Sequence, residues 1–205
     1  MFLPAVKELR EFSMQGRFMS DSGWTATAST PLIALGGMQI QRLQLQAGVD
    51  HDSLVANIST GRLQIGGNAL HGFSLESSAA NNQMSFIARF SDLAGLEKYR
   101  LAGMLKQPRY QEYELSLAPE VLLNYEVWTV APNNMVRLTS NGIEARDFML
   151  NRNFQQFSLK TRGSTLNSPI EAYFTSFHVA TLVAMAVPDS LAMDGTLDGE
   201  IVFSD

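Results

Sequence analysis

The chain has 205 residues and no cysteine, which excludes disulfide bonds, thiolate metal sites and cysteine nucleophiles. Charged residues are also scarce: they make up 17% of the chain, against about 25% in typical soluble domains. No basic cluster stands out, and the net charge of −5 argues against a nucleic-acid partner. Ser, Thr, Asn, Gln and Gly replace the missing charges, and this composition is typical of β-rich proteins with many turns.

Long apolar runs are absent as well. Residues 1–12 contain charges of both signs and lack the apolar core of a secretory signal peptide. The longest mostly apolar run, residues 179–188, has about half the length of a membrane span. We therefore expect this chain to be soluble, with any export signal or membrane anchor of a parent protein lying outside it.

Signatures of catalysis and metal binding are equally scarce. His51 lies in Asp50-His51-Asp52, which we interpret as a turn and not a metal site, because neighbouring strand residues point to opposite sides. Glu112 and Glu114 would share a strand face, as a glycosidase carboxylate pair could, but their surroundings are typical of an ordinary strand edge. We predict no catalytic residue, no metal site and no cofactor, and therefore no enzyme.

The chain does contain apolar and polar residues that alternate over many short runs, which indicates strands with one buried face. Gly-Gly, Asn-Gly and Asn-Asn pairs separate these runs, as turns require. About fifteen such strands are too many for a flat sheet, so they close into a barrel, stack as a sandwich or curl into an elongated trough. Two short helices are also predicted, at residues 4–12, where Pro4 suits the first helical position, and at 178–187.

One pattern occurs twice. Residues 37–45 read GMQIQRLQL, residues 142–150 read GIEARDFML, and both follow one template of apolar and polar positions. A Trp-Thr pair precedes each copy, beginning at Trp24 and at Trp128. Internal repetition of this kind favours a trough or solenoid, because a sandwich would be complete after one copy.

The two copies predict two β-groove modules, residues 1–105 with the N-terminal helix and residues 106–205, which form one continuous unit cut from a longer array. The 12 Phe and 10 Met residues either fill a β core or line a groove that is open to a flexible apolar ligand. Periodicity alone does not separate a filled interior from a hollow one. The positions expected to line the groove are Ile40, Leu43, Leu45, Leu63, Ile65, Phe73, Leu75, Phe86, Phe90, Leu115, Leu117, Ile143, Phe148, Leu150, Phe157 and Leu159.

Motifs in the second half are similar to those of a known family. They are Trp-x-x-x-Pro-x-Asn at residues 128–134, Phe-x-Leu at 157–159 and Gly-x-Leu-x-Gly at 195–199. Residues 13–90 resemble a preceding, more diverged module. On these motifs the chain resembles the C-terminal region of the TamB-type translocation and assembly modules, within the wider AsmA-like group of bridge proteins.

This resemblance implies a β-taco, a long sheet folded lengthwise around an apolar groove. It also implies a periplasmic protein whose inner-membrane anchor is absent from this chain and which moves phospholipid between the two membranes. The implied partners are phospholipid acyl chains, an outer-membrane barrel protein and flanking modules of the full-length chain. Two alternatives stay open: an outer-membrane protein assembly factor that pairs strands with its clients, and a β-sandwich adhesin or carbohydrate-binding module.

Overall fold

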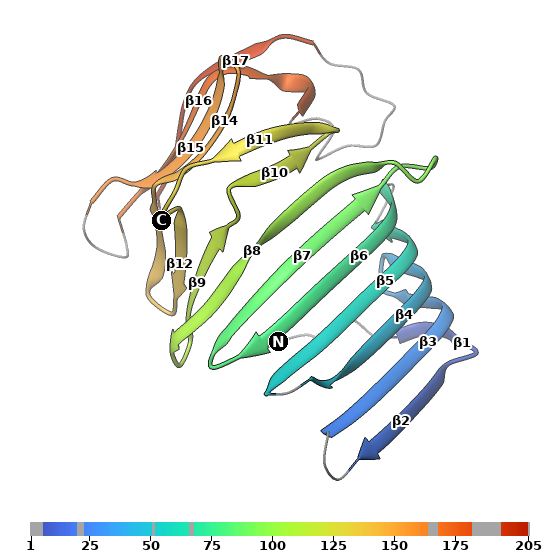
Figure 1. Cartoon of the computed structure of the whole chain (residues 1–205). Coiled ribbons are helices and arrows are strands. Elements are labelled where there is room, and N and C mark those ends of the chain that lie inside the picture. The colour runs from blue at the N-terminus through green and yellow to red at the C-terminus, as the bar shows by residue number, and fades with distance from the viewer. Residues whose placement is uncertain are drawn as a thin grey trace. The chain divides into compact units, whose positions relative to one another are not determined.

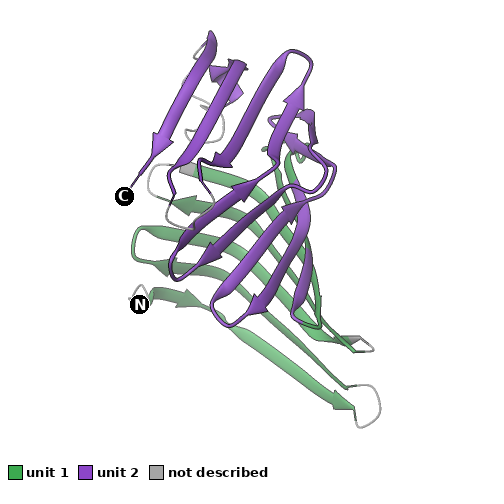
Figure 2. Ribbon diagram, turned by 90° about the vertical axis from the view of Figure 1, so that its left-hand side faces the viewer, with its two compact units in different colours: residues 1–81, 86–100 green, residues 82–85, 101–205 purple. Residues whose placement is uncertain are grey.

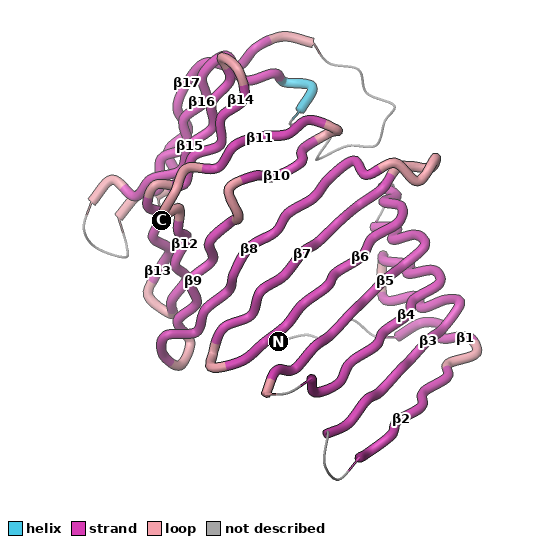
Figure 3. Tube along the Cα trace, viewed as in Figure 1, coloured by secondary structure: helices cyan, strands magenta, loops and turns pink. Residues whose placement is uncertain are grey.

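The predicted all-β class is confirmed by a computed structural model, which shows one large, open antiparallel sheet of 17 strands (Figure 1). The structure describes residues 6–19, 23–50, 52–65, 68–163, 168–181 and 194–204. Among these residues, helix is confined to 179–181 (Figure 3). The predicted helix at 178–187 overlaps this turn, but its remaining residues from 182 onward lie outside the described part of the chain.

The chain divides into two compact units (Figure 2): unit 1 is residues 1–81 and 86–100, and unit 2 is residues 82–85 and 101–205. The division into modules 1–105 and 106–205 stays a prediction. In chain order the strands are β1 (Val6–Arg10), β2 (Ser13–Met19), β3 (Gly23–Leu35), β4 (Met38–Asp50), β5 (Ser53–Ile65), β6 (Asn68–Ala80), β7 (Gln83–Ser91), β8 (Glu97–Arg109), β9 (Glu112–Leu117), β10 (Glu120–Leu123), β11 (Glu126–Val130), β12 (Met135–Thr139), β13 (Gly142–Arg146), β14 (Phe148–Arg152), β15 (Gln155–Thr161), β16 (Ile170–His178) and β17 (Thr196–Phe203).

Unit 1 is built from successive antiparallel ladders that join β2, β3, β4, β5 and β6 in chain order. Strand β1 also pairs with β3, along the end of β3 that β2 does not reach. Strand β7 lies beside β6, since the rings of Phe73 and Phe90 are 4.9 Å apart. Arg89 on β7 forms ion pairs with Glu76 on β6 and with Glu97 on β8, at 2.6 and 3.4 Å.

The predicted helix at residues 4–12 is wrong for the residues that the structure describes. Val6–Arg10 form strand β1, whose ladder runs from Val6 opposite Leu35 to Arg10 opposite Leu32. An isolated helix of nine residues is marginal in water, and most of its stability would have to come from burial of its apolar face. Here Val6 and Leu9 remain 63% and 49% exposed. The ladder with β3 satisfies the backbone without that burial, so the strand is favoured.

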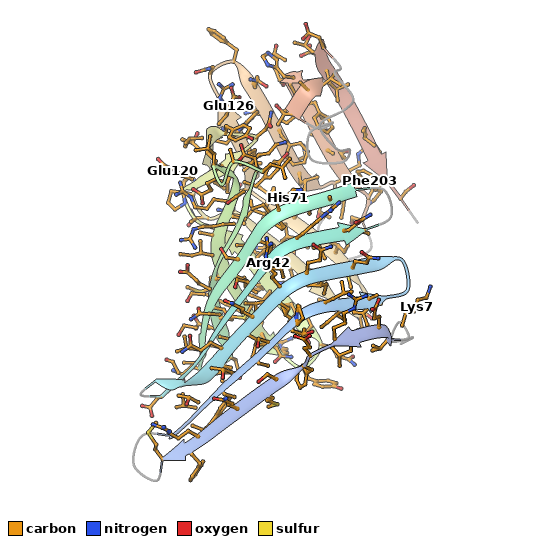
Figure 4. The ribbon with its side chains drawn as sticks, turned by 90° about the vertical axis from the view of Figure 1, so that its right-hand side faces the viewer. Lys7, Arg42, His71, Glu120, Glu126 and Phe203 are labelled. Carbon is orange, nitrogen blue, oxygen red and sulfur yellow. The ribbon has the colours of Figure 1, made fainter. Side chains whose placement is uncertain are left out.

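A bend crosses unit 1 where the apolar alternation changes phase. In β4 the apolar positions are even-numbered up to Ile40 and odd-numbered from Leu43 onward. Arg42 lies between them with a left-handed φ of 54°, and Gly72 on β6 has a φ of 52°. The Arg42 side chain (labelled in Figure 4) lies across Gly61 on β5, where an added Cβ would collide with its guanidinium group. A left-handed residue locally reverses the alternation, as in a β-bulge, so the apolar side chains can stay on one face.

A left-handed residue occurs at the same position in both copies of the repeated sequence pattern. Arg42 is the sixth residue of the first copy and Asp147 is the sixth residue of the second, and their φ angles are 54° and 47°. In the first copy β4 continues through the bend. In the second copy β13 ends before Asp147 and β14 begins after it, so the chain leaves the ladder with β12 and joins β11 and β15. The repeat therefore specifies a turn of the backbone as well as an alternation.

Unit 2 contains two series of ladders and the main hydrophobic core. Strand β9 pairs with β8 and β12, and β12 pairs with β13. The second series joins β10, β11, β14, β15, β16 and β17. The buried apolar residues of this unit are Val121, Leu122, Leu123, Trp128, Val130, Ala145, Leu150, Ala172, Phe174 and Phe177.

Candidate functional site: the apolar face of unit 1

The candidate site is a set of apolar rows that run across neighbouring strands of unit 1. Ladder partners carry one row through β3, β4, β5 and β6, and it consists of Ala28, Leu45, Ile58 and Leu75. Beyond the bend a second row crosses the same four strands and consists of Ile33, Ile40, Leu63 and Leu70. Leu43 and Phe73 lie between the two rows, and Phe73 continues onto β7 through its ring contact with Phe90.

These large side chains are only partly covered. Among the described residues of β3 to β7, no Leu, Ile or Phe is buried, although Ala34, Thr30 and Thr60 are. Leu54 and Ile65 are 46% and 53% exposed. A sheet normally buries one face against a second layer. The apolar rows of unit 1 are therefore a surface on which further apolar groups can still be buried.

The opposite face of unit 1 is polar and contains a cleft of about 630 Å³. Two polar rows flank the apolar row that contains Leu45, and strand alternation points their side chains to the side away from the Leu45 side chain. The polar lining residues are Ser13, Gln15, Thr27, Ser29, Gln44, Gln46, Asn57, Ser59, Ser74 and Glu76. This cleft therefore differs in character from the predicted apolar groove, although Ala28, Leu45, Ile58 and Leu75 of the apolar row are also among its lining residues.

The interior of unit 2, by contrast, is filled by its own side chains. Trp128 is fully buried, and its ring centroid lies 5.2 Å from that of Phe177. Phe174 lies 5.6 Å from Phe177 and 5.1 Å from Phe157. Leu150, opposite Phe157 in the ladder, is 8% exposed. Leu150 and Phe157, both predicted to line a groove, thus belong to a packed cluster.

The other predicted lining residues of unit 2 are dispersed. Phe148 on β14 is the ladder partner of Leu159 on β15. Leu115 on β9 is the ladder partner of Leu105 on β8 and of Val136 on β12. Ile143 is 41% exposed and is paired with Leu138, which is equally exposed. In unit 1, Phe86 is half-buried on β7. The structure therefore brings the predicted residues together in two places, the apolar face of unit 1 and the cluster of unit 2.

One residue to which sequence reasoning gave no role links β9 to the segment that precedes β12 in unit 2. Asn134 is 5% exposed, and its Oδ1 accepts a hydrogen bond from the backbone N–H of Leu117 at 2.7 Å. Its Nδ2 donates to the carbonyl oxygens of Leu117 and Ala131, both at 3.0 Å. The available signal was the Pro-x-Asn element that ends at this residue, because an Asn after a turn often bonds nearby backbone.

The most deeply buried charge of unit 2 is Glu171, which is 2% exposed. The Tyr173 hydroxyl donates a hydrogen bond to Glu171 Oε2 at 2.6 Å, Arg162 forms an ion pair with Oε1, and Lys160 Nζ lies 3.8 Å from Oε2. The hydrogen bond from Tyr173, assisted by the two cationic side chains and opposed by burial, lowers the pKa of Glu171 below 4.5. The same bond raises the pKa of Tyr173 to about 12. Every charge of this cluster is matched, which indicates a structural role.

Glu112 and Glu114 are also held by ion pairs. Arg137 lies 3.4 Å from a carboxylate oxygen of Glu112, 2.6 Å from one of Glu114 and 3.3 Å from one of Glu144. No group of three or more potential metal ligands occurs among the described residues. His51, in the turn interpreted above, lies outside that part of the chain.

No family model, curated protein or solved structure matches this chain. The resemblance to the TamB-type modules therefore rests on the motifs of the sequence. In the part of the chain that the structure describes, no helix combines the length and the apolarity needed to cross a membrane.

Proposed function

We propose that unit 1 binds phospholipid acyl chains on its apolar face, as one segment of a hydrophobic conduit between the inner and outer membranes. The observation that carries this proposal is the set of continuous apolar rows on β3 to β7, in which no described Leu, Ile or Phe is buried. The contacts fall on Leu43, Leu45, Phe73, Leu75 and Phe90.

The hydrophobic effect supports a lipid as the occupant. Exposure of a methylene group to water costs about 0.8 kcal/mol, so a sixteen-carbon tail in water is disfavoured by about 12 kcal/mol. Neighbouring strands lie about 4.8 Å apart, so an apolar row across four strands extends for about 14 Å. Such a row can contact an extended acyl chain along much of its length. A conduit that works in this way needs no reacting group, in keeping with the proposal that the protein is not an enzyme.

The packed cluster of unit 2 has a different part in this proposal. Leu150 and Phe157 stabilise unit 2, and acyl chains are bound by unit 1. The full-length protein acts in the periplasm from an inner-membrane anchor, with an outer-membrane barrel protein as its partner. The adhesin alternative is weaker, because a β-sandwich needs two stacked sheets and the described strands belong to one open sheet.

The proposal is tested by native mass spectrometry of the chain purified from a bacterial host. We expect phospholipid to copurify with the wild type, and its occupancy to fall at least tenfold in Leu45→Asp. Gln46→Asp is the matched control: it adds the same charge to the next residue of β4, on the polar face, and should leave occupancy unchanged. A lipid-free wild type, or equal loss in both variants, would refute the proposal, provided that circular dichroism shows both variants folded.

A further inference from the structure

Two of the edge strands of the open sheet are β2 and β17. The ladder of β2 is formed with β3, and the ladder of β17 is formed with β16. Because the sheet is not closed, the outer side of each strand leaves a row of backbone N–H and C=O groups without a strand partner among the described residues. Figure 4 labels Phe203 near the end of β17 and Lys7 on β1, the strand that adjoins β2 along β3.

Both edge strands expose large apolar side chains. All seven residues of β2 are exposed, including Met14 at 66% and Phe18 at 81%. On β17, Ile201 and Phe203 are 47% and 57% exposed. Natural edge strands usually carry Lys, Pro or a bulge that prevents pairing. Neither β2 nor β17 contains Lys or Pro, and the one register shift in the ladder between β16 and β17 lies before Gly199, so residues 199–203 of β17 pair regularly with β16. Both strands can therefore accept an additional strand.

The two edges are complementary in one antiparallel register. If Phe18 lies opposite Gly199, the aromatic ring covers a residue without a side chain, an arrangement known to stabilise glycine in strands. The same register places Arg17 opposite Glu200 and Met14 opposite Phe203. Alternation then places Met14, Phe18, Ile201 and Phe203 on one face, and Arg17 and Glu200 on the other face together with Met19, Asp198 and Val202.

The charges needed for this pairing are accessible. Arg17 is exposed and has no ion-pair partner within the described residues. The Glu200 side chain is 37% exposed, and its nearest cation, Arg162, lies 3.8 Å away and is shared with Glu171. A second cation opposite Glu200 would therefore meet an incompletely neutralised carboxylate.

We propose that β2 of one copy pairs with β17 of a second copy of this chain, antiparallel and with Arg17 opposite Glu200. The contact joins two different surfaces, so each added copy leaves one free β2 and one free β17, and the assembly grows head to tail. The cross-strand backbone bonds supply affinity, and the Phe18–Gly199 and Arg17–Glu200 pairs fix the register. This interface is independent of the proposed lipid site, which lies on the face of the sheet and not on its edges.

A cysteine cross-link tests the register directly, because the natural chain contains no cysteine. Opposite residues in an antiparallel pair have Cα atoms about 4.5–5.5 Å apart, within the range of about 4.4–6.8 Å that a disulfide spans. Mixing Gln15→Cys with Val202→Cys, which face each other in this register, should give a disulfide-linked heterodimer under mild oxidation. Gln15→Cys mixed with Ile201→Cys is the control, because residue 201 points to the opposite face, and its yield should be at least tenfold lower.

Charge reversal tests the same contact in solution by light scattering coupled to size-exclusion chromatography. We expect the wild type to associate as its concentration rises, and Arg17→Glu or Glu200→Arg to weaken association at least tenfold. The double variant R17E/E200R should restore it. A wild type that stays monomeric at all concentrations would overturn the proposal, as would equal cross-linking in both mixtures. A double variant Q15C/V202C that cross-links within one chain would also overturn it, since the two edges would then belong to the same molecule.

Discussion

Replacement of a single phenylalanine by alanine should mainly affect stability in unit 2 and mainly affect lipid binding in unit 1. Phe177 is 3% exposed, and its ring lies within 5.2, 5.6 and 6.3 Å of the rings of Trp128, Phe174 and Phe157. Phe73 is only partly buried, and its ring lies 4.9 Å from that of Phe90. We expect Phe177→Ala to damage stability and Phe73→Ala to damage lipid binding.

The magnitudes follow from burial. Full burial of a Phe side chain contributes about 1.5–3 kcal/mol, and truncation of one in an enclosed core costs about 3–5 kcal/mol once the cavity is included. Phe177→Ala should therefore lower the free energy of unfolding of unit 2 by about 4 kcal/mol. For Phe73 the transfer contribution is smaller because the ring is only partly buried, truncation at the open face leaves no enclosed cavity, and one ring contact worth about 0.5–1.5 kcal/mol is lost. Phe73→Ala should cost about 1–2 kcal/mol.

The two tryptophans allow each unit to be followed by fluorescence during urea unfolding. Trp24 lies on β3 in unit 1 and Trp128 on β11 in unit 2, so Trp24→Phe and Trp128→Phe each leave a reporter in one unit. The indole N–H of Trp128 has no hydrogen-bond partner in the structure, so its replacement by Phe loses no such bond. Equal destabilisation by Phe73→Ala and Phe177→Ala, each in its own reporter background, would refute the distinction between an open face and a filled core.

Four further predictions concern single residues. In chemical denaturation, Gly72→Ala should lower the free energy of unfolding by about 2 kcal/mol or more, because Gly72 has a φ of 52° and an added Cβ would lie 2.9 Å from Ser91 Cβ. The control Gly37→Ala should be nearly neutral, because a Cβ added there meets no atom within 4 Å. Asn134→Ala should cost about 2–3 kcal/mol in the same assay, because it removes three hydrogen bonds and leaves the part-buried N–H and C=O of Leu117 without these partners. An unchanged midpoint would contradict the assigned role. Because the pKa of Glu171 is lowered in the folded protein, its contribution to stability is complete above its ordinary pKa of 4.5 and is lost as the pH falls through the lowered value. In a pH series of thermal melts, Glu171→Gln should therefore reduce the dependence of the melting temperature on pH in this acidic range. The pKa of Tyr173 is raised, so the pH dependence is reversed: its contribution to stability is complete below pH 10.0 and is lost as the pH rises towards about 12. Absorbance titration of the phenolate should show this raised pKa.

The strands of unit 1 could be predicted because their ladders join neighbours in sequence. In β3 to β6 the alternation specifies the strand and its apolar face, and a short turn or loop leads to the next partner. The phase change in the middle of β4 was visible as two adjacent polar residues, Gln41 and Arg42. Only the backbone angles show that Arg42 is left-handed and that the same conformation recurs at Asp147.

The pairing in unit 2 was harder to predict. Strand β11 pairs with β14 as well as with its neighbour β10, and β9 pairs with β12. The β11–β14 and β9–β12 contacts join strands that are not consecutive in the chain, and alternation does not specify them. The segment Val6–Arg10 was misassigned as a helix because Pro4 and spaced apolar residues suit a first helical turn, and the free side of β3 that captures it was not visible in the sequence. Long-range pairing overrode local propensity there.

The filled cluster and the open face were also indistinguishable in the sequence. Leu45 and Leu150 occupy the last position of the two repeat copies, yet Leu150 is buried and Leu45 is not. The difference comes from Trp128 and Phe177, which reach the same cluster from β11 and β16. A period-two pattern identifies the apolar face of a strand, but the side chains that cover this face come from elsewhere in the chain.

The central claim is that acyl chains contact the apolar face of unit 1. A photoreactive amino acid placed at residue 45, and in a second variant at residue 46, tests it most directly when each protein is irradiated with phospholipid vesicles and analysed by mass spectrometry. The account predicts phospholipid adducts at position 45 in large excess over position 46, because the two side chains point to opposite faces of β4. Adducts of equal yield at both positions, or adducts found at position 46 alone, would contradict it.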